Sequence, residues 1–188
     1  MKRYANISFN DLKGDYIQPC IKELQKVALN PTGYEKNIAI MGEVGTGKTA
    51  IAYSFLNALT AQEGFSLGAT CKTVFDSSHN PICSIYTVKN IIDDIKSNFN
   101  NNKNNSTQDD CKKVPLLIID EIGLQYGTKM ERIELFDIID YRYNEMLPTI
   151  IISNLYKPEL IKEVGQRIYD RLLSNCECFE FRVKSKRR

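Results

Sequence analysis

Hydrophobic residues follow two patterns along this chain: short continuous runs, and longer stretches with helical spacing. Continuous runs at residues 37–41, 114–120 and 149–153 predict strands buried on both faces of a sheet, and shorter strands are predicted at 83–87 and 178–183. Helical spacing predicts helices at 17–29, 50–59, 88–99, 130–146, 158–164 and 164–173. Strands that alternate with helices indicate an α/β fold, a three-layer αβα sandwich with a parallel sheet.

The chain divides into a lead-in and one domain. Residues 1–33 contain one short amphipathic helix and end in the turn sequence N-P-T-G, and residues 34–188 have the length of a single domain. Residues 62–81 mix glycine, proline and apolar residues, so we predict no element there. Residues 100–110 are rich in Asn and predict a mobile loop, which is either a plain surface linker or a segment that contacts DNA.

The segment between the strand at 37–41 and the helix at 50–59 has the spacing of a Walker A phosphate-binding loop, G-x-x-x-x-G-K-[ST]. It consists of Gly42, Glu43, Val44, Gly45, Thr46, Gly47, Lys48 and Thr49. Glycines let the backbone N–H groups turn toward phosphate oxygens, and the helix N-terminus adds its dipole. We expect Lys48 to be an exposed charge for the β- and γ-phosphates of ATP, and Thr49 to be a ligand of Mg²⁺. A glycine-rich turn can match by chance, but the flanking strand and helix favour nucleotide binding.

The run at 114–120 ends in two carboxylates, L-L-I-I-D-E, which is the Walker B form. Ligands of parallel sheets bind beyond the carboxyl ends of the strands, so Asp120 is placed to reach the Mg²⁺ shell. Glu121 is then the predicted polariser of the attacking water. The alternative is an ordinary strand that ends in a solvated acidic turn.

Two further polar positions follow the next strand. Asn154 comes directly after the strand at 149–153, where its amide either hydrogen-bonds the γ-phosphate or the lytic water, or caps the following helix. Arg167 and Arg171 lie four residues apart on one helical face. A guanidinium stays protonated and suits a charge supplied in trans to a γ-phosphate. The alternative is a surface arginine paired with Asp170 or Glu163.

Charge and cysteine content limit the classes of partner and cellular location that the sequence suggests. The formal net charge is +2, so no global field argues for nucleic acid, although the last seven residues, R-V-K-S-K-R-R, carry five positive charges. That tail either contacts a phosphate backbone or is simply solvated. Six cysteines without a signal peptide do not indicate a disulfide scaffold, and no apolar run has the length of a membrane span. We therefore expect a cytoplasmic protein that has no membrane partner.

With these motifs in order, the chain resembles the AAA+ ATPase domain of the bacterial replicative-helicase loaders of the DnaC and DnaI type and the related IstB-like ATPases. The resemblance rests on G-E-V-G-T-G-K-T, L-L-I-I-D-E-I-G-L-Q, P-T-I-I-I-S-N-L and G-Q-R-I-Y-D-R-L, and it covers most of the chain. It implies a P-loop NTPase of AAA+ type that hydrolyses ATP with Mg²⁺, with Asn154 as sensor 1 and Arg167 as an arginine finger. It also implies a nucleotide-dependent homo-oligomer, contact with single-stranded DNA, and a hexameric replicative helicase as partner.

Two features depart from the family pattern. Loaders carry a separate N-terminal domain that grips the helicase, whereas about thirty residues precede the core here, and residues 62–81 look longer than the usual link. The chain is then either a truncated or phage-type loader, or one that uses residues 1–29 as a short gripping element. The alternative function is an IstB-like transposition accessory ATPase that binds target DNA. A nucleotide-dependent scaffold without turnover is a third reading, which the presence of Glu121 and Arg167 disfavours.

Overall fold

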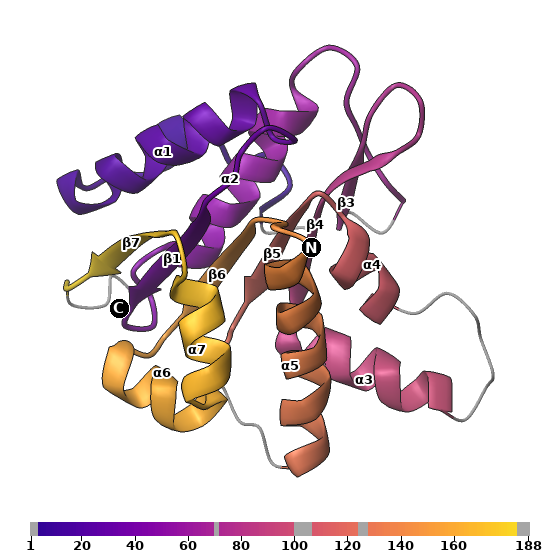
Figure 1. The fold of residues 1–188 in the computed structure, drawn as a ribbon. Coiled ribbons are helices and arrows are strands. Elements are labelled where there is room, and N and C mark those ends of the chain that lie inside the picture. Colours follow the sequence, from indigo (N-terminus) through magenta and orange to yellow (C-terminus); the bar gives the residue numbers. More distant parts are fainter. Residues whose placement is uncertain (1–3, 70–71, 100–106, 124–127, 184–188) are drawn as a thin grey trace.

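One seven-stranded sheet forms the centre of the computed structural model, which describes residues 4–69, 72–99, 107–123 and 128–183 (Figure 1). Its strands are β1 (Asn37–Gly42), β2 (Ser66–Leu67), β3 (Thr73–Phe75), β4 (Pro81–Thr87), β5 (Leu116–Asp120), β6 (Thr149–Ser153) and β7 (Cys176–Phe181). Their spatial order is β2-β3-β4-β5-β6-β1-β7. The five strands from β4 to β7 in this order are parallel, which confirms the predicted sheet.

Helices cover both faces of the sheet, as predicted. They are α1 (Gln18–Leu29), α2 (Lys48–Thr60), α3 (Val88–Phe99), α4 (Thr107–Lys113), α5 (Lys129–Asn144), α6 (Lys157–Val164) and α7 (Gln166–Leu173), with 3-10 turns η2 (Phe9–Asp11) and η3 (Asp15–Ile17). Figure 1 shows α1 and α2 together on one face, and α3, α5, α6 and α7 on the other. Among the described residues no helix is both long enough and apolar enough to cross a bilayer.

The continuous hydrophobic runs are explained by two cores, one on each face of the sheet. Along β1, Ile38 and Ile40 pack with α1 and α2, whereas Ala39 and Met41 pack with α5, α6 and α7. Parallel pairing sets Ile38 opposite Ile150, and Ile150 opposite Ile118, so neighbouring strands present isoleucine to the same core. Every position of a central strand is therefore buried, and the period of two is invisible in the sequence.

Within residues 62–81, the strands β2 and β3 extend the sheet by an antiparallel addition that was not predicted from the sequence. β2 pairs with β3, and β3 pairs with β4, both antiparallel. Gly68 follows β2, and a Cβ atom there would lie 2.7 Å from the Phe75 ring. The two added strands are two and three residues long, too short to leave a periodic pattern.

The predicted loop at 100–110 is wrong in its last four residues, because Thr107–Asp110 form the first turn of α4. The backbone N–H of Thr107 donates to the Asp94 carboxylate at 2.9 Å, and the Tyr86 hydroxyl donates to Asp110 at 2.7 Å. Asp109 and Asp110 also suit the positive end of the helix dipole. Residues 100–106 lie outside the described residues, as do 184–188 of the basic tail.

The lead-in helix α1 contributes to the same core as the rest of the protein. Cys20, Ile21, Leu24 and Val27 are buried, and they pack in one cluster with Ile51, Phe55 and Leu59 of α2. The predicted boundary at residue 33 stays a prediction. The residues before it and the domain after it contribute side chains to the same hydrophobic core.

Candidate nucleotide site

The phosphate-binding loop connects β1 to α2 at the carboxyl edge of the sheet. Its glycines have positive φ, at 154° for Gly42, 87° for Gly45 and 98° for Gly47. Gly42 is also sterically required, because a Cβ atom there would lie 2.7 Å from the carbonyl oxygen of Phe181 on β7. The loop thus has backbone conformations that glycine adopts readily, as predicted from the sequence. Helix α2 begins at Lys48, so its N-terminus lies at the loop.

Lys48 is buried, with 4% of its surface exposed, so the expectation of an exposed charge was wrong. Its Nζ donates to the carbonyl oxygens of Gly42 at 2.6 Å and Glu43 at 2.8 Å, and to Thr46 Oγ1 at 3.3 Å. A buried ammonium must be hydrogen-bonded, and here the loop itself supplies the acceptors. The cation is therefore held within the concave side of the loop, where a phosphate would compete for it.

Asp120 and Thr49 meet across the site. Thr49 Oγ1 donates to Asp120 Oδ2 at 2.9 Å, and the backbone N–H of Glu121 donates to Asp120 Oδ1 at 2.8 Å. Burial raises the pKa of the Asp120 carboxyl above its ordinary value, and these two hydrogen bonds oppose that rise. A carboxylate and a hydroxyl in contact are hard oxygen donors of the kind that Mg²⁺ takes beside phosphates and water. The two predicted metal ligands therefore fit the ion.

Glu121 is exposed at the turn that ends β5, and its φ is 62°. A positive φ is uncommon for a residue with a Cβ atom, and such strain often marks functional positions. The chain then returns to the sheet, since the backbone N–H of Ile122 donates to the carbonyl of Ile152 at 3.0 Å. This turn places the Glu121 side chain at the cleft and Ile122 in the core.

Asn154 follows β6, the strand beside β5, and lines the same cleft as Glu121. It does not cap α6, whose N-cap is Tyr156, so the capping alternative does not describe this structure. The preceding residue fixes its position: Ser153 Oγ donates to the carbonyl of Ile122 at 2.8 Å and accepts from the backbone N–H of Leu155 at 3.0 Å.

These side chains surround one cleft of about 460 Å³. The predicted residues that line it are Val44, Gly45, Gly47, Lys48, Thr49, Asp120, Glu121 and Asn154. Sequence reasoning missed Tyr4 and Ile7 of the lead-in and Ala50 of α2, which line it as well. The loop is also held from the lead-in, because the Tyr16 hydroxyl donates to the carbonyl of Thr46 at 3.1 Å.

The two arginines of α7 differ in their surroundings. Arg171 is partly buried: its Nε donates to Asp140 Oδ1 on α5 at 2.5 Å, and its guanidinium lies 4.9 Å from the centre of the Phe136 ring. An ion pair within the chain was predicted, but its partner is not Asp170, which accepts from Gln166 instead.

Arg167 is exposed and does not line the cleft of its own chain. Within the described residues its side chain shows neither of the two alternative ion pairs, with Asp170 or with Glu163. Its backbone carbonyl accepts from Arg171 at 3.2 Å, which places both residues on one side of α7. The guanidinium is thus free to meet a group outside this chain.

Comparison with known proteins agrees with this geometry. The family model described as IstB-like ATP binding protein matches residues 2–188. The replicative helicase loader DnaC of Escherichia coli K12 is 31% identical over 174 residues, which make up 90% of this chain and 64% of that protein. The chain thus spans somewhat less than two thirds of this relative.

Solved structures share the fold. The crystal structure of the DnaC helicase loader superposes with a TM-score of 0.77 at 20% identity, covering 97% of this chain and all of that one. The DnaI structure gives a TM-score of 0.74 at 21% identity, with 96% of this chain and 93% of that one covered. The AAA+ type of P-loop fold predicted from the sequence is confirmed.

Proposed function

Because this chain belongs to the family of IstB-like ATP binding proteins, we propose that it is a Mg²⁺-dependent ATPase that loads or remodels a hexameric helicase on single-stranded DNA. The observation that carries the ATPase is one cleft in which Lys48, the adjacent pair Asp120 and Glu121, and Asn154 come together from three separate segments. The helicase enters the proposal from the likeness to a protein described as a replicative helicase loader.

In the proposed binding mode the loop N–H groups and Lys48 hold the phosphates of ATP. The hydrogen bonds from Lys48 Nζ to the carbonyls of Gly42 and Glu43 hold the ammonium inside the loop before ATP binds. When ATP binds, Lys48 Nζ donates to phosphate oxygens in place of these carbonyls. Thr49 and Asp120 would hold Mg²⁺, which when bound neutralises charge on the phosphates. Asp120 must be ionised for that role, and the Thr49 and Glu121 hydrogen bonds favour its carboxylate form.

Hydrolysis in this proposal depends on Glu121 and Asn154. The Glu121 carboxylate takes a proton from the attacking water, and the Asn154 amide orients that water or the γ-phosphate. Both side chains line the cleft from the ends of adjacent strands, and neither is buried. The water therefore meets a base on one side and a hydrogen-bonding amide on the other.

Arg167 completes the site of a second copy of the chain. It cannot serve its own cleft, because it is exposed on α7 and does not line that cleft. An exposed guanidinium stabilises charge at a neighbour's γ-phosphate with a planar fork of donors. We therefore propose a nucleotide-dependent homo-oligomer in which each site is completed across an interface.

The family description also favours a second candidate, an IstB-like accessory ATPase that binds target DNA for a transposase. Both candidates use the same ATPase cycle and differ in the DNA that they bind. Preference for single-stranded DNA supports helicase loading, and preference for duplex DNA supports the transposition role.

The deciding experiment is a pull-down of the full chain against purified hexameric helicases, with ATP and without nucleotide. We expect one helicase to be retained with ATP, and much less of it with Lys48→Ala, which lacks the cation of the phosphate site. A wild-type chain that hydrolyses ATP, binds duplex DNA and retains no helicase would overturn the loader proposal in favour of the second candidate.

A further inference from the structure

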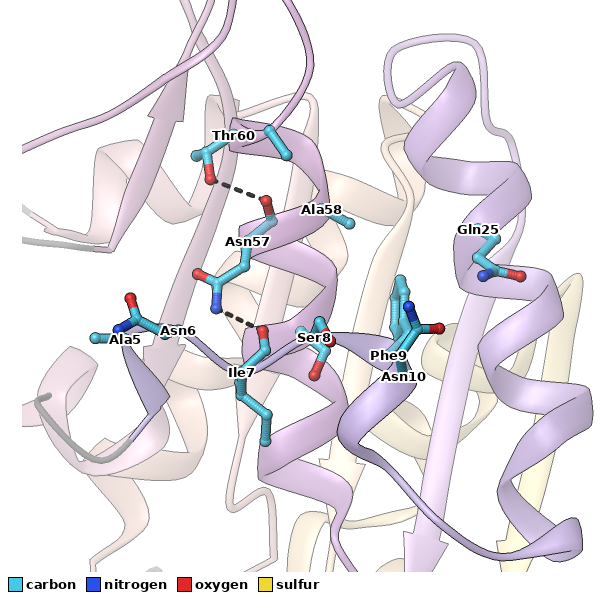
Figure 2. Close-up of a pocket in the computed structure, with 12 residues that line it drawn as sticks. Ala5, Asn6, Ile7, Ser8, Phe9, Asn10, Gln25, Asn57, Ala58 and Thr60 are labelled. Atoms are coloured by element: carbon cyan, nitrogen blue, oxygen red, sulfur yellow. Dashed lines mark hydrogen bonds between the residues drawn. The ribbon is translucent and has the colours of Figure 1, made fainter.

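A short N-terminal segment, residues 4–12, runs along α2 and reaches the nucleotide cleft; we name it the N-terminal strap. Tyr4 and Ile7 of the strap line the cleft together with the phosphate-binding loop. Figure 2 shows the strap crossing α2, with the Asn57 side chain facing the carbonyl of Ile7. The strap is thus one wall of the cleft, although it lies far from the loop in sequence.

One side chain of α2 holds this wall. Asn57 Nδ2 donates to the carbonyl of Tyr4 at 3.1 Å and to the carbonyl of Ile7 at 2.8 Å. These are the two strap residues that line the cleft, so Asn57 fixes the backbone of both. One turn earlier on α2, the Tyr53 ring stacks on the Tyr4 ring with centroids 5.2 Å apart and planes 11° apart.

Apolar side chains of the strap also pack on the core beneath it. Tyr4, Ile7, Phe9 and Leu12 are partly buried against the cluster that includes Phe55 and Leu59 of α2. An open pocket of about 450 Å³ lies beside the two hydrogen bonds (Figure 2), and its lining includes strap residues 5–10, Ala58 of α2 and Ala61, which follows α2. The Asn57 hydrogen bonds therefore fix the backbone of a strap whose apolar side chains lie on the core.

The lining of the cleft divides by chemistry. Its polar groups, Lys48, Asp120 and Glu121, suit phosphates and a metal ion, whereas Tyr4 and Ile7 offer an aromatic and an aliphatic surface. We infer that Asn57 is a positioning residue for nucleotide binding, which holds the N-terminal strap against the base and ribose part of ATP. This inference rests on the proposed ATP binding.

The consequence is a selective effect on affinity. When the strap is detached in a fraction of molecules, the apparent affinity for ATP falls by that fraction. Inorganic triphosphate contains no base or ribose, so it contacts the loop end of the cleft and does not depend on the strap. A change in the ratio of the two affinities therefore reports the strap, and damage to the loop or to the fold leaves that ratio unchanged.

The test measures binding of ATP and of inorganic triphosphate, each with Mg²⁺, to the full chain by calorimetry. Asn57→Ala removes both donors without lowering helix propensity. Thr60→Ala is the matched control, because Thr60 lines the same cavity and donates to the carbonyls of Leu56 and Asn57 in its own helix. We expect Asn57→Ala to weaken ATP binding about tenfold, as loss of two hydrogen bonds can, and to leave triphosphate binding within about twofold. Thr60→Ala should change neither affinity.

Equal ATP affinity in Asn57→Ala and wild type, or equal weakening of both ligands, would overturn the inference. A wild-type chain that binds neither ATP nor triphosphate would instead overturn the proposed function. If Asn57→Ala does not fold, Tyr4→Ala serves the same purpose, because it removes a side chain that lines the cleft and leaves the Asn57 hydrogen bonds in place. The expected selective loss of ATP affinity is the same.

Discussion

The two walls of the nucleotide cleft are built in different ways. The loop wall consists of the phosphate-binding loop and the ends of β5 and β6, and its backbone continues into paired strands of the sheet. The strap wall consists of residues 4–12, which pair with none of the described strands and are held by the Asn57 side chain, one stacked tyrosine pair and apolar side chains that pack on the core. Groups that do chemistry thus lie at the ends of paired strands, and groups that adjust affinity lie on a segment that side chains alone hold in place.

This difference separates the expected effects of substitution. A catalytic group needs a fixed position, which strand pairing supplies on the loop wall. A wall that is held by side-chain contacts without strand pairing opens at a lower cost than the sheet does. We therefore expect changes on the loop wall to alter the rate, and changes on the strap wall to alter affinity.

The largest effect is expected from a residue that lies on neither wall of its own cleft. Arg167→Ala should bind ATP as the wild type does and lose about a thousandfold in hydrolysis, because in the proposed oligomer a partner's arginine completes each cleft. Mixing it with Lys48→Ala should restore part of the activity, since one variant keeps the site and the other keeps the finger. Steady-state ATPase assays of each variant and of the mixture measure this.

The control for Arg167→Ala is Lys22→Ala, which makes the same change of charge on an exposed residue of α1, on the opposite face of the sheet. It should hydrolyse ATP at the wild-type rate. The contradicting outcome is a mixture of Arg167→Ala and Lys48→Ala that stays inactive although sedimentation shows both variants in one assembly. Arg167 would then have no role in a neighbour's cleft, and each cleft would be complete within one chain.

Glu121→Gln should bind ATP normally and hydrolyse it at least about a hundredfold more slowly, because the amide keeps the shape and cannot take the proton. Nucleotide affinity and single-turnover rates separate the two effects. The opposite result, weak binding with a normal rate constant, would place Glu121 in binding and move the base elsewhere. Glu63→Gln is the control, since Glu63 is exposed in the turn after α2 and does not line the cleft.

The loop wall could be predicted from the sequence because its geometry is local. A strand, a glycine turn and a helix follow one another within residues 37–60, so spacing alone fixes where Lys48 and Thr49 lie. Asp120 and Asn154 were predictable for a related reason, since the carboxyl ends of parallel strands share one edge of the sheet. Three of the five parallel strands, β1, β5 and β6, followed from continuous apolar runs.

The strap wall could not be predicted, because its contacts depend on residues about fifty positions apart without a pattern. Asn57 is an ordinary polar residue of an amphipathic helix until the strap is placed beside it. Arg142 of α5 is similar: it is 1% exposed, and its guanidinium donates to carbonyls at the start of β5 and β6, including Val114 at 2.8 Å and Pro148 at 2.6 Å. Such long-range contacts between side chains and the backbone leave no periodicity.

Tyr16→Phe tests whether the lead-in also supports the loop wall. The change removes the hydrogen bond to the Thr46 carbonyl and keeps the ring, which packs edge-on against Phe181 at 5.3 Å. One such bond contributes about 1 kcal/mol, so ATP should bind about fivefold more weakly. Inorganic triphosphate should weaken equally, unlike in Asn57→Ala, because Tyr16 supports the loop itself.

The matched control is Tyr34→Phe, whose hydroxyl donates to Glu23 at 3.1 Å and not to the loop. It should leave both affinities unchanged, as measured by the same calorimetric titrations. If Tyr16→Phe lowers the affinity for ATP and leaves that for inorganic triphosphate unchanged, then the lead-in acts on the loop wall through the strap. The two walls would then not be independent of each other.

The smallest effect concerns stability rather than activity. Asp120→Asn should raise the melting temperature of the nucleotide-free chain at neutral pH, while it abolishes Mg²⁺-dependent hydrolysis. The reason is that burial raises the pKa of Asp120, so the ionised carboxylate is less favourable in the folded protein than in the unfolded chain. The amide can still accept from the Glu121 N–H and donate to Thr49 Oγ1, which replaces both present hydrogen bonds.

The sign can be checked by pH. Above the folded-state pKa of Asp120 the charge destabilises the folded wild type, and as pH falls through that pKa the carboxyl takes up a proton sooner in the folded than in the unfolded chain. The advantage of Asp120→Asn should therefore be full at neutral pH and vanish in acid. Asp76→Asn should show the opposite sign, because hydrogen bonds from Asn80 lower the pKa of Asp76 and its charge favours the folded state. The measurement is thermal unfolding of wild type, Asp120→Asn and Asp76→Asn from neutral to acid pH. It decides whether the buried Asp120 carboxylate lowers the stability of the folded chain. A melting temperature of Asp120→Asn below that of wild type at neutral pH would show that the carboxylate does not lower stability.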